Sequence, residues 1–310
     1  MVIDREVFAT PHVSVGAFRC PVHHPSFRYT GPTEHYIAAF PRTGVWIRHA
    51  GSRAFVADPG VVTIYNAGQE YTREPMHPEG DRCDWFGLSE EMAHDVARAA
   101  DPRAPHDSTR PFRFQHAHSD SQLYFRQRLL FDRLIAGACD AFEAEEEVLS
   151  IVHRVLQLAS SEPRAPGKLT DAHRDLAEHA RAELVRDATT ALTLGGLAAR
   201  LDVSPWHLCR VFRAATGTSL HAFRLDLRLR MALERLENPA ADISRMAHEL
   251  GFSSHSHFTA AMRGRLGCTP SGFRSAVAGR RGSKEVEVGR SGSKCVHSST
   301  LFDRLRHPST

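Results

Sequence analysis

Residues 243–274 of the chain are ISRMAHELGFSSHSHFTAAMRGRLGCTPSGFR, and they predict two short helices joined by a tight turn. Asp242 supplies an N-cap side chain before the first helix, and Gly251, which tolerates a left-handed backbone, marks its end. Ser253 or Ser254 caps the second helix. Apolar residues recur at helical spacing on the inward side of both helices, and they are Ile243, Met246, Ala247, Leu250, Phe258 and Met262.

The same pattern of caps and stops occurs earlier in the chain, from Thr193 to Gly217. Thr193 is an N-cap for one helix and Ser204 for the next, with Pro205 at the first helical position, where no backbone N–H is needed. Residues 202–203 form the turn between them. Two helices joined in this way predict a helix-turn-helix unit. The inward residues are Leu194, Leu197, Ala198 and Leu201, followed by Leu208, Val211 and Phe212.

One long helix is predicted between the two units, over residues 219–237, and Asn238-Pro239 ends it. Its length is roughly 28 Å at about 1.5 Å per residue. Successive major-groove faces of B-DNA lie about 34 Å apart. A rigid spacer of this size lets two reading helices enter adjacent grooves, so we interpret the pair as one DNA-binding module. Beyond the second unit, Thr269-Pro270 begins a short final helix that contains Phe273.

Together the two units closely resemble the DNA-binding domain of the AraC family of transcription regulators. The matching motifs are A-x-x-x-G-F at 247–252, S-x-x-x-F at 254–258, Met262-Arg263, and G-x-x-P at 267–270. The resemblance covers residues 170–277 and implies an all-α tandem helix-turn-helix (homeodomain-like) domain. Gly195-Gly196 departs from the acidic helix formers usual in the family, and it weakens the supporting helix by about 1 kcal/mol per glycine.

The resemblance also implies which side chains face DNA. These positions are held by Trp206, His207, Cys209, Arg210 and Arg213 in the first unit and by His255, Ser256, His257, Thr259, Arg263 and Arg265 in the second. Arg210 can donate two hydrogen bonds to a guanine and Trp206 can contact a thymine methyl group, although Trp206 can equally cover the helix start and Arg210 can be solvated. Because Ala260 cannot hydrogen-bond a base, we expect the second unit to depend on phosphate contacts, from Arg263 and Arg265, and on DNA shape.

The first hundred residues predict a β-rich domain, because short segments rich in β-branched and aromatic residues alternate with Gly, Pro, Asn and Asp. Four such segments are HYIAAF (35–40), GVWIRHA (44–50), AFVADPG (54–60) and VVTIYNAG (61–68). This region resembles the cupin-like jelly roll found in many AraC-family members, which implies a sensor of a small-molecule effector. The expected fold class is multi-domain: an N-terminal all-β cupin-like jelly roll plus helices, and a C-terminal all-α domain.

Five segments are expected along the chain. Residues 1–100 form the cupin-like sensor domain, and residues 118–160 form two helices for dimerisation or linking. Residues 161–168 contain two prolines and a glycine and form the inter-domain linker. Residues 169–278 form the DNA-binding domain, and residues 279–310 form a basic tail that is predicted to be disordered. By resemblance to the family, the protein is expected to be a homodimer.

Composition and charge fit a cytoplasmic protein that meets a polyanion. No apolar run reaches the roughly 18 residues of a membrane span, and the N-terminus lacks a signal-peptide pattern. Residues 1–167 carry a net charge of −5 and residues 168–280 one of +5. We therefore expect double-stranded operator or promoter DNA as a partner, RNA polymerase as a second, and neither a cofactor nor a membrane. The pattern does not separate activation from repression.

Metal or redox sensing remains an alternative for the N-terminal domain. Cys20, His23, His24, His77 and Cys83 are soft ligands or redox groups, and the last two flank a predicted hairpin turn. The alternative interpretation is that this grouping has no metal or redox function, because a chain with 20 histidines forms chance clusters often. The six cysteines form no C-x-x-C pair, so free thiols in a reducing compartment are expected.

An enzyme is disfavoured, because the first hundred residues lack the H-x-H and Glu pattern of metal-dependent cupins, and the chain lacks a nucleophile elbow or P-loop. His116-x-His118 lies beyond the expected strands, and His255-x-His257 lies on a reading helix. A DNA-alkylation repair regulator would need a Pro-Cys-His nucleophile, which is absent. An architectural DNA binder would not need the acidic, sensor-like first half.

Overall fold

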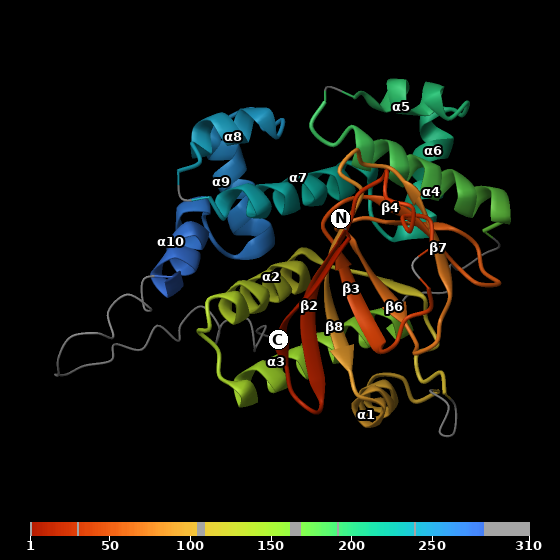
Figure 1. The fold of residues 1–310 in the computed structure, drawn as a ribbon. Helices are drawn as coiled ribbons and strands as arrows, with labels where there is room; N and C mark the ends of the chain where they lie inside the picture. The colour runs from red at the N-terminus through yellow and green to blue at the C-terminus, as the bar shows by residue number, and fades with distance from the viewer. Residues whose placement is uncertain are drawn as a thin grey trace.

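The computed structural model of the chain describes residues 2–29, 31–103, 109–161, 169–190, 192–238 and 240–281. A β-sheet domain occupies the N-terminal half and a helical domain the C-terminal half (Figure 1). This arrangement confirms the multi-domain fold class predicted from the sequence. The predicted linker beyond Ser161 and the predicted tail beyond Arg281 lie outside the described residues.

Two sheets make up the β domain within the described residues. The larger has the strand order β1-β2-β8-β3-β6-β9, and the smaller has the order β5-β4-β7. Every pair of neighbouring strands is antiparallel, as expected for a jelly-roll type of domain. The strands are β1 (Ile3–Ala9), β2 (Val13–Cys20), β3 (Tyr36–Pro41), β4 (Val45–His49), β5 (Phe55–Ala57), β6 (Val61–Tyr65), β7 (Tyr71–Pro75), β8 (Asp81–Leu88) and β9 (His116–His118).

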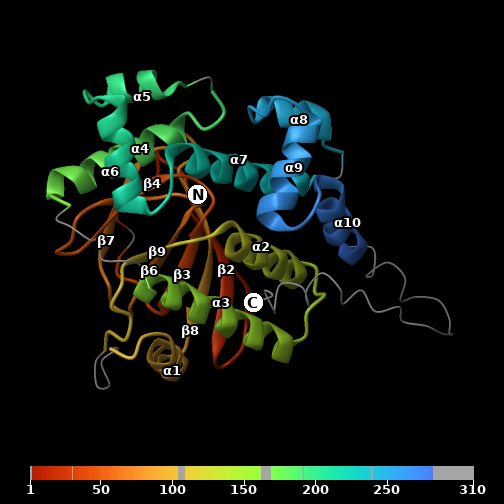
Figure 2. The ribbon, with the colours of Figure 1, turned by 180° about the vertical axis from the view of Figure 1, so that it is seen from behind.

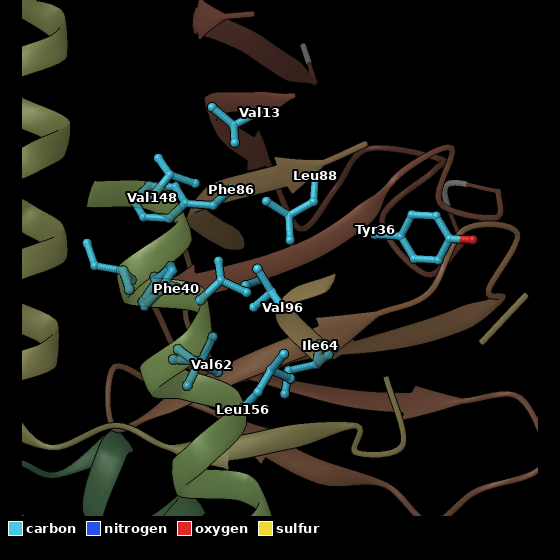
Figure 3. Packing of buried hydrophobic residues seen from close by; sticks show 14 of the residues in the cluster. Val13, Tyr36, Phe40, Val62, Ile64, Phe86, Leu88, Val96, Val148 and Leu156 are labelled. Atoms are coloured by element: carbon cyan, nitrogen blue, oxygen red, sulfur yellow. The ribbon is translucent and has the colours of Figure 1, made fainter. Parts of the chain in front are cut away.

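Helices cover one face of the larger sheet. Alternate residues of each strand point to this face, so one set of strand side chains packs against the helices. On that side Phe40, Phe86 and Ile64 pack with residues of α1 (Glu90–Ala100) and α3 (Ala141–Ser161) in a single apolar cluster. Figure 3 shows Val148 and Leu156 of α3 lying over the strands of this cluster. The alternate residues on the other face point toward the smaller sheet.

Two expectations about the β domain were wrong. The turn at Pro78–Asp81 does not close a hairpin, because β7 pairs with β4 whereas β8 pairs with β2 and β3, so the turn connects the two sheets. His116-x-His118 is not beyond the strands but forms β9, which pairs with β6. A three-residue strand is too short to show an alternating pattern, and its partner lies far away in the sequence.

The C-terminal half is all helical, as predicted, and its caps are the predicted ones. The side chains of Thr193, Ser204 and Asp242 accept hydrogen bonds from backbone N–H groups in the first turns of α5, α6 and α8. Of the two serines considered for α9, Ser254 is the cap. The helices are α4 (Asp171–Arg186), α5 (Leu194–Arg200), α6 (Pro205–Thr216), α7 (Leu220–Leu236), α8 (Ile243–Glu249), α9 (His255–Leu266) and α10 (Pro270–Arg281).

The long helix α7 joins the two helix-turn-helix units, α5–α6 and α8–α9 (Figures 1 and 2). Its 17 residues correspond to about 26 Å, slightly shorter than the predicted spacer. Gly217 at the end of α6 and Gly267 at the end of α9 both have a φ of 73°, the left-handed conformation that the predicted stops require. In the described part of the chain, no helix is both long and apolar enough to span a membrane.

One glycine of α5, Gly195, and the glycine after α6, Gly217, provide a matched test of these backbone roles. A methyl group added at Gly195 meets no atom within 4 Å, so Gly195→Ala is expected to stabilise the helical domain by about 0.5 kcal/mol. Gly217→Ala also meets no neighbour, but its positive φ makes the change destabilising by about 1 kcal/mol. Urea unfolding followed by circular dichroism measures both, and shifts of the same sign would contradict this account.

Candidate nucleic-acid interface

The outer face of α6 carries most of the predicted DNA-facing residues of the first unit. Leu208, Val211 and Phe212 are buried, so the opposite side of the helix faces solvent. Trp206 lies there with 73% of its surface exposed, and the Arg210 guanidinium lies 5.5 Å from the centre of its ring. The indole and the guanidinium thus form a cation–π pair on the exposed side of α6.

The other predicted residues of α6 differ in their surroundings. Cys209 and Arg213 are exposed. His207 is half-buried, because its ring packs 5.6 Å from the ring of His173 on α4. Its Nδ1 lies 3.5 Å from an Arg210 nitrogen, so His207 supports the arginine from the side of α4. His207 is therefore at the edge of the exposed face rather than at its centre.

On α9 the structure separates the predicted residues into two groups. His255, Ser256, His257 and Arg263 are exposed on the outer side. The Nδ1 atom of His257 lies 3.0 Å from the hydroxyl of Ser253, so this ring is held in place.

Two residues of the α9 set point elsewhere. Thr259 is half-buried, and its hydroxyl has no hydrogen-bond partner. Arg265 is exposed like Arg263, but its Nε lies 3.7 Å from a carboxylate oxygen of Asp226 on α7. The same Asp226 accepts a hydrogen bond from the Ser121 hydroxyl of α2 (Ser121–Ile135), so Arg265 belongs to the contact between α9, α7 and α2. A role in holding phosphate therefore fits Arg263 better than Arg265.

Sequence reasoning did not select Ala214 and Gly264, yet both are exposed on the outer faces of their helices. The i, i+4 spacing could have found them, because it continues the series from Arg210 to Ala214 and from Ala260 to Gly264. Small residues at these places let the helix backbone approach a partner surface closely. They offer no polar group of their own side chains.

The helical domain is attached to the β domain through a buried ionic cluster around Asp84 of β8. This carboxylate accepts hydrogen bonds from Arg128 of α2 at 2.6 Å, from Arg42 at 3.1 Å and from Gln127 at 2.9 Å. Burial alone raises the pKa of Asp84, but the two guanidinium charges outweigh it and the net pKa lies below the ordinary value. Asp84 is therefore ionised at neutral pH.

The two arginines of this cluster also reach the spacer helix. Arg42 and Arg128 both pair with Glu234 and Glu237, which lie on the last turns of α7. Arg128 is almost fully buried, and its charge is balanced by Asp84, by these two glutamates and by Asp132 one turn along α2. One connected set of charges thus joins β8, α2 and α7, and we call it the Asp84 cluster.

A second buried pair attaches the helix that precedes the first unit. Arg181 of α4 and Asp58, in the loop between β5 and β6, are both fully buried and form an ion pair. The Glu178 carboxylate accepts a hydrogen bond from the backbone N–H of Val56 at 2.7 Å. Figures 1 and 2 show α4 lying beside the smaller sheet in both views. The helical domain is therefore joined to the β domain through both α4 and the end of α7.

Helix α2 lies between the two domains. Its residues Tyr124, Phe125 and Leu129 belong to the core of the second helix-turn-helix unit, and the Phe125 ring lies 5.5 Å from that of Phe273 on α10. Leu123 and Leu130 of the same helix belong to the core of the β domain. The sequence predicted a dimerisation or linking role for residues 118–160. The contacts of α2 place it between the core of the β domain and the core of the second helix-turn-helix unit of the same chain.

A cavity of about 470 Å³ lies between the two sheets of the β domain. Its lining includes Ile37, Thr63, Tyr65, Cys83 and Trp85, which are the alternate residues of β3, β6 and β8 that point away from the helices. A volume of this size can hold a small organic molecule. The strand β8 therefore faces the cavity with one set of side chains and the Asp84 cluster with the other.

The metal and redox alternative finds little in these residues. Across the described residues, no three His, Cys, Asp or Glu side chains gather in a way that could hold a metal ion. The register pairs Cys20 with Asp81 and Cys83 with Phe18, so the two thiols do not face each other across the strands. Burial raises the pKa of both thiols, whereas a reactive thiol needs a lowered one.

Comparison with known proteins relates this geometry to a family. A family described as a helix-turn-helix domain matches residues 197–276. The chain is 30% identical over 88 residues to the Msm operon regulatory protein of Streptococcus mutans, covering 28% of this chain and 32% of that protein. It is 33% identical over 124 residues to the HTH-type transcriptional regulator GlxA of Rhizobium meliloti, covering 38% of each. The chain thus spans about a third of the length of these curated relatives.

Two solved structures are similar at a low level. ToxT of Vibrio cholerae with a bound unsaturated fatty acid gives a TM-score of 0.34 at 9% identity, over 88% of this chain and 98% of that chain. The AraC-like transcriptional activator CuxR gives a TM-score of 0.35 at 15% identity, over 76% and 79%. At these values neither structure bears on the function of this chain.

The histidines beside the inter-domain contact predict a marked sensitivity to acid. Burial, with the charge of Arg181, lowers the pKa of His116 from 6.5 to about 3, and its ring stacks 4.3 Å from Phe55. Below pH 6.5 the His116 imidazole therefore binds a proton in the unfolded chain but stays neutral in the folded chain. The contribution of the neutral His116 to the free energy of unfolding is complete above pH 6.5. It falls as the pH is lowered, by about 2 kcal/mol between pH 7 and pH 5.

His116→Phe keeps the stacked ring and removes the titration. We expect urea midpoints at pH 7 and pH 5 to differ less for this variant than for the unchanged chain. An exposed histidine of the β domain, His12, gives the control His12→Phe, which should keep the full difference. An equal loss of stability in all three proteins would contradict the assignment.

Proposed function

We propose that the protein is a transcription regulator of the AraC type that binds double-stranded DNA in a sequence-specific way, because residues 197–276 match a family described as a helix-turn-helix domain. The main support is that α6 and α9, each the second helix of a capped pair, expose polar and aromatic side chains at the two ends of one stiff helix. The net charge of +5 on residues 168–280 favours a polyanionic partner.

In this proposal the two units contribute differently. The first reads bases through Arg210, held by Trp206 and His207, because a guanidinium can donate two hydrogen bonds to guanine. The second holds the duplex through Arg263 and the backbone of α9, whose outer face carries Ala260 and Gly264. Specificity at the second half-site then depends more on the shape of the DNA than on direct contacts.

Regulation is proposed to start in the cavity of the β domain. A small-molecule effector bound there contacts β8 directly, and the opposite side of β8 carries Asp84. Any shift of that strand changes the pairing of Arg42 and Arg128 with Glu234 and Glu237, and so the position of the spacer helix α7. A homodimer, contact with RNA polymerase and a cytoplasmic location are parts of the same proposal.

The role of Arg210 can be tested with Arg210→Ala. We expect it to weaken binding to the cognate site by about 1–3 kcal/mol and to relax base preference at one position. Arg98→Ala, which removes an exposed arginine of the β domain, is the control and should change neither. Site selection from random oligonucleotides, followed by titration of the selected duplex at fixed salt, measures both effects. An equal loss on all sequences would mark Arg210 as a phosphate contact.

The Asp84 cluster can be tested with Glu234→Gln combined with Glu237→Gln. The two amides keep the size of the side chains but remove the ion pairs between the arginines Arg42 and Arg128 and the end of α7, which should destabilise the chain by about 2 kcal/mol. Backbone amides of α2 and α7 should exchange with deuterium faster, because their contact is weakened.

The matched control is Glu249→Gln on α8, which removes an exposed carboxylate that pairs with Arg235 and Arg245. An exposed pair contributes well under 1 kcal/mol, so this change should leave exchange in α2 and α7 as it was. If the double variant and Glu249→Gln showed the same deuterium exchange in α2 and α7, the Asp84 cluster would have no part in the proposed coupling between the cavity and α7.

A further inference from the structure

The lining of the β-domain cavity indicates the charge of its ligand. We propose that the cavity binds a small molecule with an apolar or aromatic body and a cationic amine, and that it rejects carboxylates. This inference rests on the proposed function only in treating the cavity as the effector site. The binding itself is a property of the β domain and can be measured without DNA.

The inner wall of the cavity combines apolar and aromatic side chains with the polar Thr63 and Asp81. Ile37, Val45 and Ile47 come from both sheets, and Tyr65 and Trp85 add two large aromatic rings. The face of an aromatic ring attracts a cation placed over it, and this attraction is strongest for tryptophan. Such a wall suits a ligand with an apolar body whose charged end is an ammonium group.

The position of Trp85 depends on Gly16. A methyl group at Gly16 would lie 2.3 Å from the Trp85 ring, so only glycine allows the indole to cover the neighbouring strand. The indole N–H then donates a hydrogen bond of 2.9 Å to the carboxylate of Asp4 on β1. The same hydrogen bond therefore fixes the ring and places an acidic side chain beside it.

The arginine nearest to this wall is not available to a ligand. Arg73 lies behind it, fully buried, and donates a hydrogen bond of 2.7 Å to Asp81 and another of 3.2 Å to the backbone oxygen of Ser26. Its guanidinium also lies 5.0 Å from the centre of the Phe18 ring. Asp81 and Arg73 therefore balance each other, and neither sets the charge preference of the cavity.

The exposed part of the lining is acidic. It includes Asp4 and Glu6 on β1 and Glu34 in the loop before β3, and all three side chains are solvent-exposed. The described lining contains one histidine, His35, and no lysine or arginine. A carboxylate entering this cavity would meet like charges and would lose its water without gaining an ion pair. An amine would meet opposite charges and the aromatic rings together.

A set of three molecules with one indole body separates these cases: tryptamine, tryptophol and indole-3-acetate. Binding to the full chain is measured by isothermal titration calorimetry at low salt and, in parallel, by the shift in thermal unfolding. We expect tryptamine to bind most tightly, tryptophol more weakly, and indole-3-acetate roughly tenfold more weakly than tryptamine or not at all. Added salt should narrow the difference, because exposed charges are screened.

Glu34→Gln combined with Glu6→Gln should weaken tryptamine binding several-fold and leave tryptophol unchanged. Both changes are at exposed positions, so the chain should fold as before. The control is Glu74→Gln, an exposed glutamate of β7 outside the lining. Preferential binding of indole-3-acetate, an unchanged amine affinity in the double variant, or no binding by any of the three at millimolar concentration would overturn the proposal.

Site selection with random DNA is run on the same preparations. Loss of sequence-specific DNA binding with the amine preference intact would reject the proposed function and keep this inference. Sequence-specific DNA binding without any preference for the amine would support the proposed function and reject this inference.

Discussion

The burial of Asp84 together with Arg42 and Arg128 is the constraint on which the arrangement of the two domains depends. A buried charge is tolerated only when opposite charges and hydrogen bonds surround it, so these three side chains cannot be separated without a large cost. Glu234 near the end of α7 and Glu237 at its C-cap pair with both arginines, in addition to Asp84 and Asp132. The orientation of the spacer helix on the β domain is therefore specified by ionic contacts, with the apolar contacts of α2 filling the space around them.

The two faces of strand β8 have different surroundings. Asp84, Phe86 and Leu88 point to the helices, whereas Cys83 and Trp85 point into the cavity. Because successive side chains of a strand point to opposite faces, the cavity and the Asp84 cluster share the backbone of β8. The paired attachment through Arg181 and Asp58 holds the first unit in the same way. The helices α6 and α9 thus belong to one framework with the β domain.

Much of the helical half was predictable because its signals are local. Thr193, Ser204 and Asp242 act as caps within three residues of the N–H groups that they accept from, and Gly217 needs only its own backbone angle. Helical spacing gave the buried residues Leu208, Val211 and Phe212 of α6, and the resemblance to the AraC family gave its exposed positions. The β half was less predictable, because β9 and the connection from β7 to β8 depend on strands distant in the chain.

The sequence alone determined the existence of the two capped helix pairs, the helix between them and the side on which Arg210 lies, because each depends on residues within a turn or two. Only the tertiary structure decided that Arg265 faces Asp226, that α2 is covered on both sides, and that Asp84 joins three elements. Those facts arise where side chains far apart in sequence share one desolvated space. In that space, charge balance selects the partners, and no local pattern records the choice.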